Sequence, residues 1–163
     1  MIKLIKTKIY IMNKKDVENF QFERDKEYLI ISISGYYEPL ANFSISVLYN
    51  DDITIKFFLF DDVDKETKYY DLENNQYHYL IPMKKDQAND IVHLVEKHYN
   101  QVDYTIVHCN AGISRSAGIV GALCKWLWND DSYVFEDEYF KPNIYVYRML
   151  LDSFYENIEK GKQ

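Results

Sequence analysis

The sequence predicts an α/β domain with a mainly parallel central sheet and helices on both of its faces. Three observations support this. The chain has 163 residues, of which 47% are hydrophobic and 28% charged, as in one soluble globular domain. Short β-branched runs alternate with longer segments that are apolar at helical spacing. We find no internal repeat and no Pro/Gly linker, so residues 1–163 are expected to form a single domain.

Apolar runs mark the expected strands. Residues 28–34 (YLIISIS) and 53–60 (ITIKFFLF) are rich in β-branched and aromatic side chains, and Gly35 ends the first of them. Residues 104–108 (YTIVH) form a third run, typical of a buried strand. Weaker strand candidates are residues 9–12, residues 44–48 and an extended piece near 77–81, inside a polar loop that spans 61–83.

Helices are expected between and after these strands. Asn13 can cap a short helix over 14–20. Residues 84–100 place their apolar side chains on one helical face, and residues 114–129 form a helix directly after the third strand and a short turn. An acidic, aromatic loop over 130–141 leads to Pro142, which opens a last helix to about residue 160.

The net charge and the cysteine content limit which classes of binding partner and which cellular compartment are expected. The formal net charge of −7 disfavours nucleic-acid binding, which depends on Lys and Arg contacts to phosphates. No run of 18 apolar residues predicts a membrane span, and the first residues lack a secretory pattern. Cys109 and Cys124 are expected to lie on the order of 20 Å apart, too far for a disulfide. Two free thiols are typical of a reducing compartment, so a cytoplasmic location is expected.

The segment from His108 to Ser116 (HCNAGISRS) has the composition of an anion site. A buried strand delivers Cys109 to the carboxyl edge of the sheet, where ligands bind in such folds. A tight turn and a helix N-terminus follow, and their amides can form a nest for an anion. Gly112 permits a backbone conformation that a Cβ would obstruct. The residues expected to bind the anion through this turn are Asn110, Ala111, Gly112, Ile113 and Ser114.

The side chains around this turn suggest phosphoryl chemistry. The chain has 16 lysines and three arginines, so an arginine at position 115 suggests that its fork geometry matters, because it can hold two phosphate oxygens. A Cys109 thiolate facing a bound tetrahedral anion is a nucleophile aimed at phosphorus. Ser116 can donate its hydroxyl to the Cys109 sulfur, and His108 can fix the turn through its ring nitrogens.

HCNAGISRS resembles the Cys-x5-Arg-Ser/Thr signature of protein tyrosine phosphatases and dual-specificity phosphatases. The wider chain is similar to compact prokaryotic- or phage-like members, whose ISIS and F-x-D segments match Ile31–Ser34 and Phe60–Asp62, and the resemblance covers roughly residues 28 to 128. It implies that Cys109 forms a cysteinyl-phosphate and that Arg115 binds the phosphate and the transition state. It further implies that Ser116 assists breakdown of the intermediate, and that neither a metal nor an organic cofactor takes part.

The same resemblance implies a general acid, an Asp on a loop above the turn. Strands 53–60 and 104–108 are joined through helix 84–100 and should be parallel, which puts Asp61 and Asp62 on the Cys109 side. The family's spacing favours Asp62 and leaves Asp61 as the alternative or as a supporting residue. Asp62 lies 47 residues before Cys109, a long interval because residues 64–80 look inserted. Further candidates are Asp64, Asp71 and Asp86.

The expected activity is hydrolysis of phosphate monoesters on protein tyrosine, with serine and threonine as further targets, so the expected partner is a phosphorylated protein or peptide. A phosphoinositide or nucleotide-end phosphatase is an alternative, less favoured because the turn carries no Lys. A pseudophosphatase that binds phosphotyrosine without cleaving it is another. Such a protein would be expected to lack the nucleophile, the arginine or the acid, and candidates for all three are present.

Overall fold

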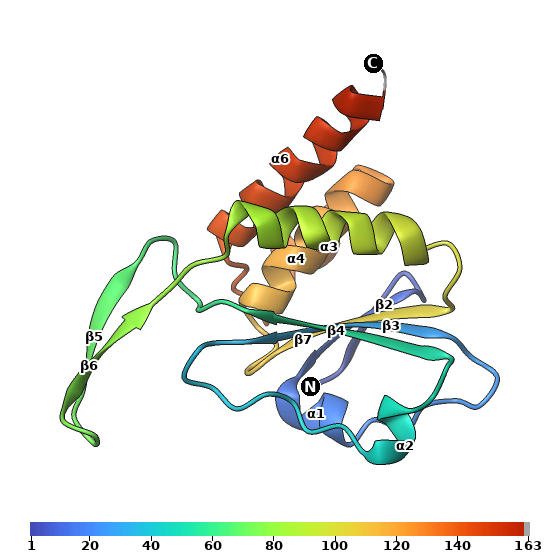
Figure 1. Cartoon of the computed structure of the whole chain (residues 1–163). Helices are drawn as coiled ribbons and strands as arrows, with labels where there is room; N and C mark the ends of the chain where they lie inside the picture. Colours follow the sequence, from blue (N-terminus) through green and yellow to red (C-terminus); the bar gives the residue numbers. More distant parts are fainter. Residues whose placement is uncertain (162–163) are drawn as a thin grey trace.

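A five-stranded sheet forms the centre of the protein, whose computed structural model describes residues 1–161 (Figure 1). Its strand order is β1-β2-β7-β3-β4. Strands β2, β7, β3 and β4 are parallel, and β1 pairs antiparallel to β2 at one edge. The strand bounds are β1 Lys3–Ile5, β2 Ile9–Asn13, β3 Tyr28–Ser34, β4 Ile53–Leu59 and β7 Tyr104–Cys109.

Helices cover both faces of this sheet, as Figure 1 shows. The longer helices α3 (Lys85–His98), α4 (Arg115–Trp128) and α6 (Ile144–Gly161) lie on one side and enclose the larger hydrophobic cluster. The short helices α1 (Lys14–Glu18) and α2 (Ile45–Leu48) lie on the other side. The predicted α/β class, with a mainly parallel sheet between helices, is confirmed. No helix within residues 1–161 has both the length and the apolarity to cross a membrane.

The central position of β3 explains its sequence. All seven residues of Tyr28–Ser34 are buried, because β7 and β4 flank the strand and helices cover both of its faces. Strands in that position appear in the sequence as continuous apolar runs rather than alternating ones. β4 and β7 both pair with β3 in parallel, so their carboxyl ends meet at one edge of the sheet, as predicted.

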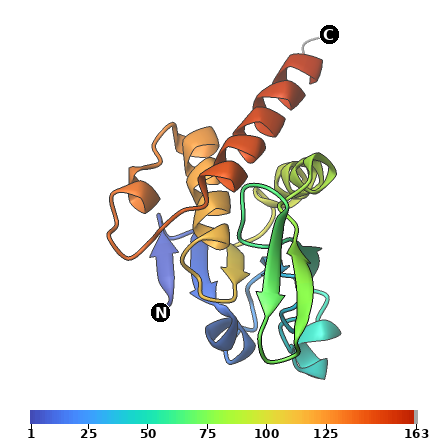
Figure 2. The ribbon, with the colours of Figure 1, turned by 90° about the vertical axis from the view of Figure 1, so that its left-hand side faces the viewer.

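Three segments differ from the sequence prediction. Residues 44–48, predicted as a strand, contain helix α2, because the Ser44 side chain caps the helix by accepting from the amide of Val47. Inside the loop predicted over 61–83, the extended piece expected near 77–81 is strand β6 (Gln76–Leu80), and it pairs with an unpredicted strand, β5 (Thr67–Asp71), in an antiparallel hairpin. The hairpin extends away from the sheet at the left of Figure 1 and faces the viewer in Figure 2. The N-terminal strand β1 was not predicted.

The start of the last helix also differs. α6 begins at Ile144, after Pro142 rather than at it, and the Asn143 Oδ1 accepts a hydrogen bond from the amide of Val146 at 3.1 Å. Helix α4 approaches this point closely: a Cβ on Gly118 would lie 2.6 Å from the carbonyl oxygen of Asn143. A glycine is therefore needed where α4 passes the first turn of α6. The short helix α5 (Ser132–Phe135) lies in the connection between them.

Candidate active site

Cys109 lies where β7 ends, at the carboxyl edge of the sheet, and α4 begins six residues later at Arg115. The thiol is buried, with 2% of the residue exposed. Its Sγ accepts a hydrogen bond from the amide of Gly112 at 3.3 Å and lies 3.2 Å from the Ser116 Oγ. The structure thus brings together the predicted nucleophile, the turn glycine and the predicted hydroxyl donor.

The carbonyl groups of the turn bond to neighbouring segments outside it. The Asn110 carbonyl accepts from the amide of Lys14 at 3.1 Å, and the Ile113 carbonyl accepts from the amide of Lys141 at 3.0 Å. The Ser114 carbonyl accepts from the amides of Gly118 and Asn143. These bonds tie the turn to α1, α4 and the start of α6. Backbone amides of a turn held in this way can converge on an anion.

Gly112 is the turn residue that cannot carry a side chain. Its φ is +70°, a backbone conformation that L side chains rarely adopt. A Cβ there would lie 2.7 Å from both the carbonyl carbon of Met12 and the amide nitrogen of Asn13. The turn therefore packs directly on the carboxyl end of β2, which explains the predicted need for glycine.

Arg115 is buried and held on one side by two acceptors. Its Nη1 donates to the carbonyl of Phe60 at 3.1 Å, and its Nη2 lies 2.7 and 3.1 Å from the two carboxylate oxygens of Glu38. The Nε is buried and has no hydrogen-bond partner within residues 1–161. A buried donor without a partner is costly in free energy. Glu38 was missed by the sequence analysis, and its one signal is its position just past a buried strand.

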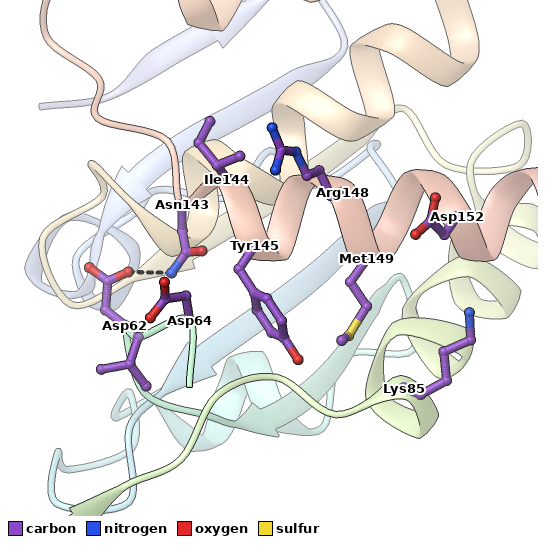
Figure 3. Close-up of a pocket in the computed structure, with 10 residues that line it drawn as sticks. Asp62, Asp64, Lys85, Asn143, Ile144, Tyr145, Arg148, Met149 and Asp152 are labelled. Atoms are coloured by element: carbon purple, nitrogen blue, oxygen red, sulfur yellow. Dashed lines mark hydrogen bonds between the residues drawn. The ribbon is translucent and has the colours of Figure 1, made fainter. Parts of the chain in front are cut away.

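Asp62 lies beside the turn. Its Oδ1 accepts from the Ser114 Oγ at 2.7 Å and from the Asn143 Nδ2 at 2.8 Å, and Figure 3 shows the latter bond. The Oδ2 has no hydrogen-bond partner in the part of the chain that the structure describes. Asn143 was missed by the sequence analysis, although a short polar residue before a helical run is a capping signal.

Asp61 points elsewhere. Its Oδ1 accepts from the amide of Tyr36 at 3.2 Å and its Oδ2 from the amide of Ile81 at 2.8 Å. Of the further acid candidates, Asp64 is exposed, Asp71 binds Asn74 and His78 within the hairpin, and Asp86 lies in the first turn of α3. None of these carboxylates bonds to residues 108–116.

His108 lies directly behind the turn and is fully buried. Its Nε2 is 2.6 Å from the Ser32 Oγ and its Nδ1 is 3.4 Å from the Cys109 carbonyl oxygen. Burial lowers the pKa of His108 to about 4, so its imidazole is neutral near pH 7. A neutral ring with a partner on each side links β3 to the end of β7.

A groove of about 800 Å³ begins at Asp62 and runs along the first turns of α6. In Figure 3, Tyr145 and Met149 project from α6 on the same side as Asp62 and Asp64, with Lys85 at the far end. Residues 108–116 do not line the groove, so it lies beside the turn rather than over it. Within residues 1–161, no three His, Cys, Asp or Glu side chains gather closely enough to hold a metal ion.

No protein-family model matches the sequence, and neither does any curated protein. Solved structures do match the fold. PTPMT1 in complex with PI(5)P has a TM-score of 0.63 at 14% identity, over 98% of this chain and 98% of that one. The human tyrosine phosphatase-like serine/threonine/tyrosine-interacting protein has a TM-score of 0.62 at 16% identity, over 98% of this chain and 97% of that one. DUSP15 has a TM-score of 0.58 at 18% identity, over 98% of this chain and 90% of that one.

The chain has the fold of the dual-specificity phosphatases. At such low identity the likeness establishes the architecture alone. The chemistry of the site depends on the side chains at this edge of the sheet.

Proposed function

We propose that the protein is a cysteine-dependent phosphatase that hydrolyses phosphotyrosine in proteins or peptides, with phosphoserine and phosphothreonine as further substrates. The observation that carries the proposal is the position of the Cys109 Sγ, 3.3 Å from the Gly112 amide and 3.2 Å from the Ser116 Oγ, at the base of a turn flanked by Arg115 and Asp62. The likeness to dual-specificity phosphatases supports it.

The first step transfers the phosphoryl group to sulfur. The turn amides and the unpartnered Nε of Arg115 bind the phosphate oxygens. The Cys109 thiolate attacks phosphorus, so a P–S bond forms as the ester P–O bond breaks. Asp62 donates a proton to the leaving phenolic oxygen, and its Oδ2 carries that proton because Oδ1 already accepts two hydrogen bonds.

The second step releases phosphate. Asp62, now a carboxylate, takes a proton from the water that attacks phosphorus, and the P–S bond breaks. The sulfur leaves as a thiolate, stabilised by the Ser116 hydroxyl and the Gly112 amide. Arg115 balances the charge that develops on the equatorial oxygens in both steps.

Ser114 and Asn143 orient the acid for both steps, since each donates to the same Asp62 oxygen. The groove that starts at Asp62 gives room for the residues next to the phosphorylated side chain. Two free, buried thiols are consistent with a reducing, cytoplasmic location.

A lipid substrate is the second candidate, because the PTPMT1 structure that resembles this chain is a complex with PI(5)P. The turn 110–114 offers no Lys and the net charge is −7, which disfavours a polyanionic headgroup, although Lys14 and Lys15 line a hollow beside Asn110 and Ala111 and supply positive charge there. A binding-only role is the third candidate, since one structural neighbour is named an interacting protein. The presence of Cys109, Arg115 and Asp62 together favours an enzyme.

The test is hydrolysis of a phosphotyrosine peptide, a phosphothreonine peptide and a phosphoinositide, side by side in EDTA. We expect the phosphotyrosine peptide to be cleaved fastest and EDTA to have no effect. Faster cleavage of the phosphoinositide would assign the lipid activity instead. Binding of the phosphotyrosine peptide without any hydrolysis would identify a binding module.

A further inference from the structure

The carboxylate of Asp61 joins two segments that are far apart in the sequence. It accepts from the amide of Tyr36, in the loop after β3, and from the amide of Ile81, just after β6. The amide of Asp61 also donates to the Ile81 carbonyl at 2.7 Å. Asp61 is 5% exposed, and a buried carboxylate that accepts two backbone hydrogen bonds is costly to displace. These bonds fix residue 36 relative to the end of β4 and the base of the hairpin.

The segment fixed by Asp61 carries the partner of Arg115. Glu38 lies two residues after Tyr36 and binds the Arg115 Nη2 with both carboxylate oxygens. Gly35 packs against both acids: a Cβ there would lie 2.4 Å from the Asp61 Oδ1 and 3.0 Å from the Glu38 Oε1. Both carboxylates therefore pack against the same glycine, at the start of the loop that carries Glu38.

We infer that Asp61 is a positioning residue for Arg115 that acts through Glu38, an inference that rests on the proposed function. Asp61 transfers no proton, because both of its oxygens bond to backbone amides. It anchors the loop from which Glu38 holds one side of the guanidinium, so that the Nε faces the phosphate. In the proposed reaction Asp61 thus sets the direction of Arg115, whereas Asp62 transfers the proton.

This role predicts a distinctive kinetic effect of Asp61→Asn. An amide side chain has one acceptor oxygen, so one of the two backbone amides loses its partner and the loop shifts. We expect kcat/KM to fall roughly 10- to 100-fold, as for other displaced positioning groups. The loss should be equal for phosphotyrosine and for an activated aryl phosphate, because anion binding rather than proton transfer is impaired. The affinity for tungstate should fall by a similar factor.

Two further variants separate positioning from loss of the fold. Gly35→Ala leaves every functional group in place but pushes on the Asp61 and Glu38 carboxylates, so it should weaken tungstate binding too. Asp130→Asn is the matched control. The Asp130 carboxylate accepts from the amide and hydroxyl of Ser132, in the connection between α4 and α6, and this change should leave tungstate affinity unchanged.

The deciding experiment is a double-mutant cycle of Asp61→Asn and Glu38→Ala, read out by tungstate affinity in calorimetry and by kcat/KM. If Asp61 acts through Glu38, its replacement should cost less than about 3-fold once Glu38 is absent. Additive losses, or wild-type tungstate affinity in a folded Asp61→Asn protein, would overturn the inference. If Asp61→Asn does not fold, wild-type affinity in Gly35→Ala overturns it instead. If the wild type cleaves no phosphate ester, the proposed function fails, and the tungstate cycle still decides the role of Asp61.

Discussion

Glu38 holds the Arg115 Nη2 with both carboxylate oxygens, at 2.7 and 3.1 Å, from a segment 77 residues away in the sequence. The carbonyl of Phe60 accepts from Nη1 on the same guanidinium. The Nε stays buried and without a partner in the described part of the chain. A planar guanidinium with five N–H donors can donate to Glu38, to Phe60 and, through Nε, to a further acceptor at the same time, whereas an ammonium group cannot.

Arg115→Lys should therefore impair catalysis although it keeps the charge. We expect kcat/KM for a phosphotyrosine peptide to fall about 100- to 1000-fold, the range for loss of one preorganised oxyanion donor. Arg24→Lys, a change of an exposed arginine in the loop before β3, is the control and should match the wild type. Near-normal kinetics for Arg115→Lys would show that Arg115 serves the fold alone.

Asp62→Asn should slow the reaction most for substrates whose leaving group has a high pKa and must be protonated as it departs. The loss should be strong for phosphotyrosine, whose phenol has a pKa of about 10, and small for an aryl phosphate with an acidic phenol. Asp61→Asn should show no such dependence on the leaving group. If Asp61→Asn alone shows the leaving-group dependence, the two roles are exchanged.

Much of the site could be predicted because its residues are consecutive. The run from His108 to Ser116 contains the nucleophile, the turn and the arginine, and the buried strands before it place that run at the sheet edge. Glu38 and Asn143 could not be predicted in this way. Each reaches the site from a distant segment, and its contact depends on how two loops pack rather than on any local pattern.

Exposed side chains explain why some elements were not predicted. The hairpin 67–80 exposes side chains on both faces, including Tyr69, Tyr77 and Tyr79, so it lacks the alternation of a half-buried strand, and only its second strand was expected, as an extended piece near 77–81. Ile45 and Leu48 of α2 are apolar but exposed, which made their segment resemble a strand. The capping bond of Ser44, rather than burial, determines that local structure.

Acid should destabilise the fold through His108. Burial lowers the pKa of His108 to about 4, below the value of about 6.5 in the unfolded chain, so the unfolded state binds the proton first. The free energy of unfolding should fall by about 3 kcal/mol from this group between pH 6.5 and pH 4. In denaturant unfolding, the free energy of unfolding of His108→Asn should lack this decrease between pH 6.5 and pH 4. The control His93→Asn, at an exposed site on α3, should show the same decrease as the wild type. Parallel profiles for the wild type and His108→Asn would contradict this.

The two cysteines should differ in reactivity. Burial, followed by the charges of Asp130 and Asp131, raises the pKa of Cys124 to about 12, and its side chain lies in the core. Cys109 lies in the turn that would receive the substrate. Iodoacetate at pH 6 should therefore label Cys109 far faster than Cys124, and tungstate should protect it. Equal labelling, measured by mass spectrometry of the two peptides, would argue against an activated thiolate.

Replacement of the nucleophile tests the central claim most directly. Cys109→Ser removes the thiolate but keeps the turn amides and Arg115. Hydrolysis of a phosphotyrosine peptide should be abolished, while calorimetry should still detect binding of that peptide. Substantial hydrolysis by Cys109→Ser, under conditions where the wild type is active, would contradict a mechanism that proceeds through a cysteinyl-phosphate.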